Sequence, residues 1–192
     1  MAKKDGPCST QDRCFLGFLL FCLHSRSRFA DAARVRTEPV LDLDSDGEGF
    51  IEATTVGKYV KTGQTAKRSR MSVPMVGIAG GLSGCSARSS WATAWLELRK
   101  ELGLDAAKDK CLMPVPLKDG GFGSRRLSSS DGGRWLKSLA PSLGVDGEGL
   151  SRIGTHSCKV TLLSWAAKAG VPKASRRLLG AHSNRNDRSV LE

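Results

Sequence analysis

Residues 151–192 constrain the fold of this chain most strongly. Thr155 can cap a helix that extends to Ala169. Gly170 can end this helix, because glycine adopts positive φ without strain, and Pro172 can open the next one, where its missing N–H is not needed. A helix, a tight turn and a second helix are therefore predicted. The first helix is expected to bury an apolar stripe made of Leu162, Trp165, Ala166 and Ala169.

Basic side chains mark both of these predicted helices. His156 and Lys159 are three residues apart, a spacing that projects both side chains onto one helix face. The positive end of the helix dipole lies there as well, so an anion is the expected partner of this face. The second helix carries three cations that could reach phosphates or guanines, namely Lys173, Arg176 and Arg177.

The composition allows one buried core and favours a polyanionic partner. Hydrophobic residues make up 40% of the 192 residues, enough for one domain, which we place at residues 13–192 after a disordered N-terminus at residues 1–12. The formal net charge of +11 favours a polyanion as a partner, although a generally basic surface explains the charge equally well. The charge is uneven, because residues 38–52 hold six acidic residues and no basic one.

An apolar run at residues 14–23 predicts a buried core helix. It is too short to cross a bilayer, which takes about 20 residues, and no small-x-small cleavage site follows it, so neither a membrane span nor a signal peptide is expected. The six cysteines form no Cys-x-x-Cys pair, which argues against a metal site and a disulfide framework and favours an intracellular, reducing compartment. Cys22 and His24 are expected to pack in the core rather than to bind metal.

The middle of the chain predicts a small sheet followed by helices. Residues 50–59 and 70–76 are rich in β-branched residues and read as two strands joined by a basic turn. Ser90 can cap a helix with core tryptophans, residues 103–127 read as irregular, and Asp131 can cap a further helix that ends before Pro141. Residues 146–149 read as a turn. We therefore predict an α+β fold, mostly helical, with about five helices around a small antiparallel β-sheet.

Three short segments resemble the motifs of one enzyme family. His156-Ser-Cys-Lys159 resembles the His-x-x-Arg/Lys box of the tyrosine recombinases, the phage-integrase and mobile-element enzymes that break and rejoin DNA. Leu178-Leu-Gly-Ala-His182 resembles their Leu-Gly-His box, and Arg28-Phe-Ala-Asp31 resembles the segment of their first catalytic arginine. The order of the three segments along the chain matches the family.

The resemblance implies a set of site residues around a DNA phosphate. Arg28 and Lys159 would clamp the non-bridging oxygens, and His156 would donate to one of them. Lys61, in the turn between the two strands, would protonate the leaving oxygen, and His182 would support the site. Arg26 competes with Arg28 for the first position and Lys67 with Lys61 for the lysine, and three side chains are assigned to DNA contacts outside the clamp, namely Arg26, Lys67 and Arg68. The family chemistry implies no metal and no cofactor.

The sequence departs from the family pattern in ways that affect activity. Lys159 replaces the usual arginine and cannot form a two-pronged contact, and His182 falls one residue later than expected. The family nucleophile is a tyrosine after the Leu-Gly-His box, whereas the single tyrosine of this chain is Tyr59. We therefore expect a recombinase-like domain that binds DNA but is inactive in strand transfer. No membrane association is expected, and a homo-oligomer on DNA is compatible with this interpretation. The protein is expected to be nuclear if it is eukaryotic. The alternative is a non-catalytic helix-turn-helix module formed by residues 162–179.

Overall fold

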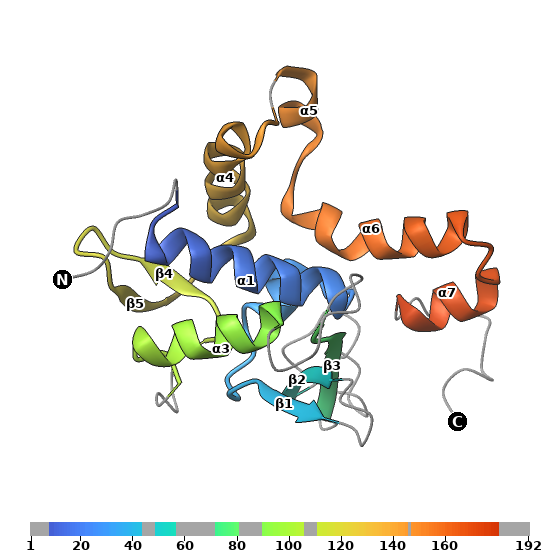
Figure 1. The fold of residues 1–192 in the computed structure, drawn as a ribbon, viewed down its shortest axis with the longest axis horizontal. Helices are drawn as coiled ribbons and strands as arrows, with labels where there is room; N and C mark the ends of the chain where they lie inside the picture. Colours follow the sequence, from blue (N-terminus) through green and yellow to red (C-terminus); the bar gives the residue numbers. More distant parts are fainter. Residues whose placement is uncertain are drawn as a thin grey trace.

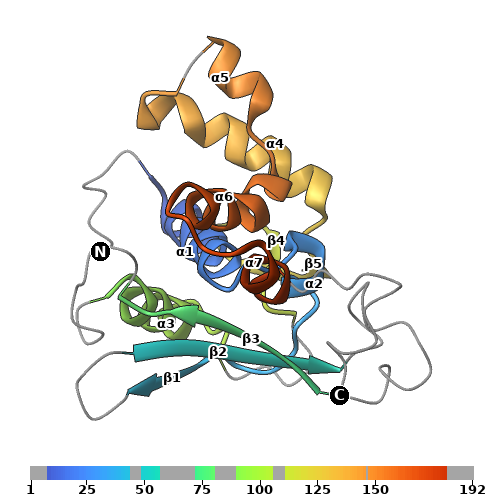
Figure 2. The same cartoon turned by 90° about the vertical axis from the view of Figure 1, so that its right-hand side faces the viewer.

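A computed structural model describes residues 8–43, 49–56, 72–80, 90–105, 111–145 and 147–180. Helices form most of it, and two small antiparallel sheets complete a mixed α+β architecture, as the sequence predicted. The larger sheet lies on one side of the first helix, and the helix of residues 155–168 lies on the other (Figures 1 and 2). Within this described part of the chain, no helix is long and apolar enough to cross a membrane.

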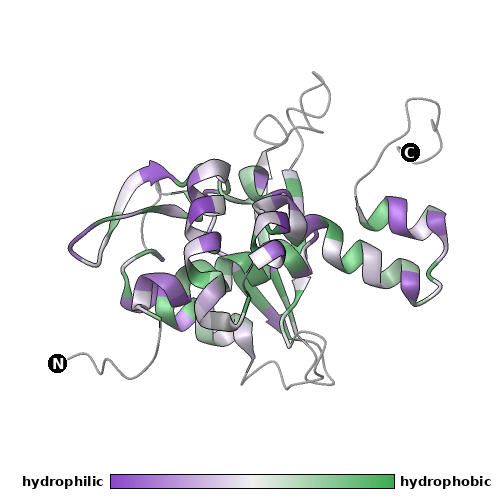
Figure 3. Ribbon diagram, turned by 90° about the horizontal axis from the view of Figure 1, so that it is seen from above, coloured by the Kyte–Doolittle hydropathy of each residue, from purple (hydrophilic) through white to green (hydrophobic). Residues whose placement is uncertain are grey.

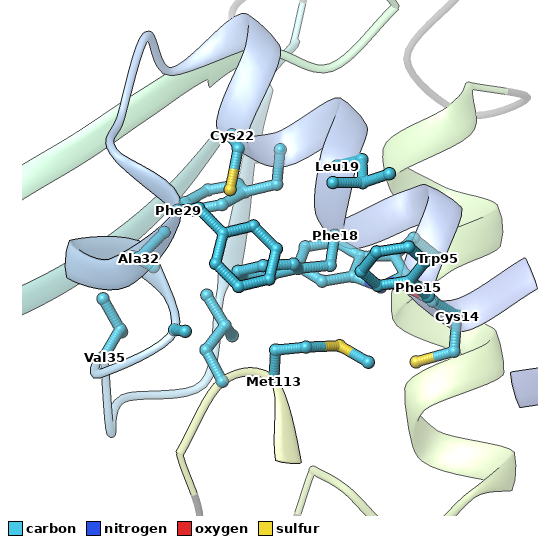
Figure 4. Close-up of a cluster of buried hydrophobic side chains, with 14 of the residues drawn as sticks. Cys14, Phe15, Phe18, Leu19, Cys22, Phe29, Ala32, Val35, Trp95 and Met113 are labelled. Atoms are coloured by element: carbon cyan, nitrogen blue, oxygen red, sulfur yellow. Dashed lines mark hydrogen bonds between the residues drawn. The ribbon is translucent and has the colours of Figure 1, made fainter. Parts of the chain in front are cut away.

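The apolar run near the N-terminus forms the central helix α1, Thr10–His24. Ser9 caps this helix, with its hydroxyl accepting from the Asp12 N–H at 3.1 Å and its own N–H donating to the Asp12 carboxylate at 2.9 Å. Residues 9–12 therefore form the capping box and first turn of α1, which begins before the predicted start of the domain at residue 13. The core packs around α1, as Figure 4 shows, with fully buried members such as Cys14, Phe15 and Phe18.

Three antiparallel strands form the larger sheet, in the order β1 (Val40–Leu43), β2 (Gly49–Val56) and β3 (Ser72–Ile78). The pairing of β2 with β3 confirms the two predicted strands, whereas β1 was missed because it has only four residues beside an acidic run. Ile51, Ala53 and Met75 are buried on the inner face, which packs toward α1. The alternate residues of the strands face outward, in keeping with the two-residue period of a strand.

Helix α3, Trp91–Glu101, packs beside α1 and is capped by Ser90, as predicted. The Trp95 side chain is 2% exposed, and its Nε1 donates to the Cys14 carbonyl at 3.0 Å. Gly17 allows this close approach, because a Cβ at that position would lie 2.2 Å from the Trp95 ring. The tryptophans of this helix therefore serve the core, as the sequence indicated.

Residues 103–127 are less irregular than predicted, because they contain the hairpin of β4 (Pro114–Pro116) and β5 (Phe122–Arg126). The following helix α4, Ser129–Leu139, is capped by Ser128 instead of Asp131, which lies inside the first turn. A 3-10 turn at Ala140–Leu143 then leads to helix α5, Gly147–Arg152, where the sequence had indicated only a turn. Short strands with proline and a helix that starts with glycine give weak local signals.

The C-terminal helices are α6, Thr155–Lys168, and α7, Lys173–Leu179, joined by a turn in which Gly170 has φ 78°. Gly154, not Thr155, occupies the N-cap position of α6. The predicted apolar stripe is wrong in part, because Trp165 is 47% exposed and Ala169 is exposed. Helix α6 packs on α1, but its C-terminal half and α7 project away from the rest of the fold (Figures 1 and 3), so the stripe has little to pack against.

Candidate functional site

A cleft of about 270 Å³ opens where four distant parts of the chain meet. These parts are the segment that joins α1 to the short helix α2 (Phe29–Ala32), the outer edge of β3, the first turns of α6 and the end of α7. Figure 2 shows α7 above the β3 strand and next to α2. The cleft is lined by three cations and one acid, namely Arg26, Arg28, Lys159 and Asp31.

Arg28 stands at the N-cap position of α2, where its extended backbone conformation turns the chain into the helix. Its Nη1 lies 3.7 Å from the carboxylate of Asp31, one turn further along, and the Asp31 side chain is only 10% exposed. The buried acid therefore holds the guanidinium in place at the cleft. This ion pair joins the two charged residues of the Arg-x-x-Asp segment that the sequence analysis singled out.

Lys159 reaches the same cleft from α6 although it is far from Arg28 in the sequence. The residue is 3% exposed. Burial lowers the pKa of the Lys159 ammonium, the positive charge of Arg28 lowers it further, and the carboxylate of Asp31 opposes both effects. A buried lysine beside a second cation is electrostatically unfavourable in the absence of an anion. The cleft is therefore built to receive negative charge.

Arg26, for which a DNA contact was predicted, has a guanidinium that is hydrogen-bonded within the protein. Its backbone has φ 53°, a left-handed conformation that is uncommon for residues with a side chain. Its guanidinium donates to three main-chain carbonyls, those of His24 at 3.0 Å, Leu179 at 3.1 Å and Val76 at 3.4 Å. Arg26 thus joins the end of α1, the end of α7 and the edge of β3. Of the two arginines proposed for the first family position, Arg28 is the one paired with an acid.

The remaining predicted site residues differ in how far their side chains are exposed. His156 lies three residues before Lys159 on α6. Its side chain is exposed, whereas Lys159 is buried at the cleft. Lys173 is exposed on α7, while Arg176 is half-buried and its Nε donates to the Val171 carbonyl at 2.9 Å. Arg177 is half-buried on the same helix. The other predicted residues, Lys61, Lys67, Arg68 and His182, lie outside the described residues.

The sequence analysis missed the polar residues that shape the base of the cleft. Ser25 and Ser27 are buried, and the Ser25 hydroxyl donates to the Phe21 carbonyl at 2.6 Å. Behind them, His24 is 5% exposed and stacks on Trp91 at 5.2 Å between ring centroids. Burial and the charge of Arg26 lower the pKa of His24. The burial of His24 confirms the core position that the sequence analysis expected, whereas Ser25 and Ser27 had no signal in the sequence.

The cysteines of this region pack as predicted, and the part of the chain covered by the structure holds no group of side chains that could bind a metal ion. Cys22 is buried in α1 and Cys158 is half-buried in α6. Burial raises the pKa of the Cys158 thiol to about 11. Both residues are therefore protonated at neutral pH and behave as small apolar side chains.

Comparison with known proteins gives a match in structure alone. No family model matches the sequence, and no curated protein matches it. Among solved structures, the chain is similar to an Flpe–Holliday junction complex, with a TM-score of 0.54 and 12% identity. Similar values are found for an FLP recombinase–Holliday junction complex, at 0.53 and 13%, and for a point mutant of Flpe with a DNA Holliday junction, at 0.52 and 12%.

These alignments cover 96% of this chain and 41–42% of the recombinase chains. The chain therefore spans about two fifths of the length of the structures that it matches. At this level of identity the similarity concerns the fold. The fold of this chain resembles part of Flp recombinase, in agreement with the family resemblance of its sequence motifs.

Proposed function

We propose that this chain is a DNA-binding domain of the tyrosine-recombinase type, whose cleft holds a backbone phosphate. The observation that carries the proposal is the convergence of Arg28 and the buried Lys159 on one cleft. A plain helix-turn-helix does not require these two residues, from opposite ends of the chain, to meet. The similarity to recombinases that were solved with DNA junctions supports the same partner.

The two cations suit the two kinds of contact that a phosphate accepts. Arg28 presents a planar fork, held by Asp31, that can donate two parallel hydrogen bonds to phosphate oxygens. Lys159 supplies a compact charge from a site with little water, where an ion pair is stronger than it is in bulk solvent. A bound phosphate would replace the repulsion between the two cations with attraction to both. Binding is therefore expected to depend strongly on salt.

The family roles of the other candidate residues belong to the same proposal. His156 would donate to a phosphate oxygen from the exposed face of α6, and Lys61 and His182 would complete the site. Strand cleavage is not included, because Tyr59, the single tyrosine in the 192 residues, precedes the His156–Lys159 box and does not match the family nucleophile. Assembly of several copies on DNA is compatible with the proposal.

Duplex binding across a salt series tests the proposal. We expect Arg28→Ala and Lys159→Met each to weaken binding by about tenfold, which corresponds to about 1.4 kcal/mol. Each variant should also reduce the slope of log affinity against log salt by about one, as expected for the loss of one phosphate contact. Arg134→Ala is the matched control, because its side chain is 78% exposed on α4, away from the cleft lining. Unchanged slopes in folded Arg28 and Lys159 variants would contradict the proposal.

The second candidate is the helix-turn-helix, and it is favoured by the geometry of α6 and α7. The two helices contact each other across a short turn, and α7 exposes Lys173. If α7 enters the major groove, Lys173→Ala should weaken binding to a preferred sequence more than binding to random duplex. Loss of affinity in this variant, together with wild-type binding by Arg28→Ala, would favour the helix-turn-helix over the cleft.

A further inference from the structure

The edge of the larger sheet that lies farthest from the cleft is formed by β1, which pairs with β2 on one side only within the described residues. A groove of about 410 Å³ lies over the start of β1 and the neighbouring part of β2, lined by Thr37, Glu38, Val40, Leu41, Asp42, Glu52 and Thr54. Val40, the first residue of β1, is 63% exposed in the groove. An unpaired strand beside a groove offers main-chain donors and acceptors to an added strand.

Hydrogen bonds fix the residues at one end of the groove. The Thr37 hydroxyl donates to the Thr54 carbonyl at 2.7 Å and accepts from the Thr54 N–H at 3.0 Å, which closes β2 where β1 does not reach. Glu38 accepts from Nε and Nη2 of the buried Arg99 at 3.1 and 3.0 Å. These contacts hold the start of β1 in place, and no described strand pairs with its outer edge.

The two faces of β1 differ in chemistry. Asp42 and Glu52 are exposed on the outer face, and Glu52 lies opposite Val40 in the register of the two strands. Leu41, on the inner face, packs against the core, and Leu43 on the same face is 42% exposed. A strand added here would place alternate side chains beside the carboxylates and beside the leucines. The matching sequence alternates basic and apolar residues.

The charge of this region also argues against nucleic acid as the occupant. Residues 38–52 hold six acids and no base in a chain with a net charge of +11. Carboxylates at the groove repel phosphates and attract lysine and arginine side chains. Arg99, the one base that touches the groove acids in the described structure, is already paired with Glu38. The groove therefore has the opposite preference from the cleft.

We propose that the β1 edge binds an extended, Lys/Arg-rich segment of another protein by β-strand addition. The main chain of the segment pairs with Val40–Leu43, and its apolar side chains continue the inner face beside Leu43. One basic side chain lies beside Asp42, and another reaches across Val40 toward Glu52 of β2. This surface lies at the opposite edge of the sheet from the cleft. A partner bound there would leave the DNA-binding cleft accessible.

Titration of the whole chain with a short synthetic peptide that alternates lysine and valine tests the proposal, with backbone NMR shifts as the readout. We expect the largest shifts at residues 40–43 and saturable binding. Asp42→Lys combined with Glu52→Lys should weaken binding by about tenfold or more, because both attractive charges become repulsive. Glu97→Lys, an exposed acid on α3 outside the groove, should bind as the wild type does.

Two peptide controls separate strand pairing from simple charge attraction. A peptide that alternates glutamate and valine should not bind. A lysine–valine peptide with N-methyl groups on alternate amides keeps its charge but loses its main-chain donors, and it should also fail to bind. Equal binding of the methylated peptide, or binding that persists in the doubly reversed variant, would overturn the proposal.

Two further results would count against it. A folded wild-type chain that does not bind the lysine–valine peptide at low salt has no such docking site. Concentration-dependent self-association that shifts residues 40–43 without any peptide would identify a second copy of this chain as the occupant instead. DNA affinity of the doubly reversed variant should not fall in either case, so this test is independent of the cleft.

Discussion

The two edges of the larger sheet differ in the charge of the side chains beside them and in their hydrogen-bond partners. At the β3 edge, Arg26 donates to the Val76 carbonyl, and two further cations line the cleft. At the β1 edge, carboxylates lie beside a strand whose outer side pairs with no described strand. At the β3 edge, Arg26 occupies a main-chain carbonyl and the neighbouring cations suit an anion. At the β1 edge, the carboxylates suit a basic strand. The sheet therefore separates the two binding sites proposed above.

The energetic cost also differs between the two edges. Arg99 is buried at the β1 edge together with a carboxylate partner and two carbonyl acceptors, so its charge is satisfied within the fold. Lys159 is buried at the β3 edge beside Arg28, and Asp31 only partly offsets the repulsion. Burial of a lysine beside a second cation is a cost to stability that a binding site can tolerate. The difference agrees with the proposal that an anion binds at Lys159 and not at Arg99.

The largest effect is expected for Arg99→Ala at the acidic edge. The change leaves Glu38 without its partner and removes the hydrogen bonds to the Leu104 and Leu112 carbonyls. We expect the free energy of unfolding to fall by about 3 kcal/mol, because two buried carbonyls lose their donor at about 1–3 kcal/mol each. The Glu38 side chain is 35% exposed and can bind water. Chemical denaturation measures the change. A loss below about 1 kcal/mol would show that Arg99 does not anchor this edge.

A smaller effect is expected for Arg26→Ala at the basic edge. Three hydrogen bonds to carbonyls are lost, and the unfolding free energy should fall by about 2 kcal/mol. Because Arg26 joins the end of α7 to the end of α1, hydrogen exchange in Lys173–Leu179 should accelerate more than exchange in α3. Equal acceleration in both helices would indicate general destabilisation instead of release of α7.

Lys159→Met should change stability and binding in opposite directions. Methionine fills a similar volume without charge, so the free energy of unfolding should rise by about 1 kcal/mol while DNA affinity falls. The stabilisation should shrink as pH rises toward the ordinary pKa of lysine, because the folded-state pKa of Lys159 is lowered and the wild type sheds the unfavourable charge. A variant that loses both stability and affinity would indicate a structural lysine.

The smallest effect concerns His24 and pH. Its folded-state pKa is lowered, so the unfolded chain takes up a proton more readily, and stability should fall as pH drops below the ordinary histidine pKa of about 6.5. His24→Phe keeps the ring beside Trp91 but does not titrate, and it should reduce the loss of stability between neutral and mildly acidic pH. Denaturation midpoints at several pH values test this. An unchanged pH dependence would assign it to other groups.

Much of the fold follows from local patterns. Glycine at the end of α6, serine before α3 and the apolar run of α1 predicted elements that the structure confirms, because caps and periodicity act within a few residues. Local signals were weaker for β1 and the β4–β5 hairpin, whose strands are short and depend on partners elsewhere in the chain. The cap of α4 was misassigned by three residues because serine and aspartate both suit that position.

The candidate site also depends on contacts between residues that are remote in sequence, which local patterns do not predict. The family motifs singled out Arg28, Asp31 and Lys159, and the structure brings these three residues to one cleft. The motifs could not distinguish Arg26 from Arg28, because two arginines only two residues apart have the same local signal. Only the carbonyls of α7 and β3, which are remote in sequence, show that Arg26 serves the fold.

The sequence by itself determined the apolar run of α1 and the ends of several longer helices, since each depends on neighbours along the chain. The tertiary structure decided which charges are buried, which are paired and which lie beside each edge of the sheet. Burial and pairing depend on groups that meet only after folding, as Lys159 meets Arg28 and as Arg99 meets Glu38. The opposite character of the two sheet edges is therefore a property of the folded chain.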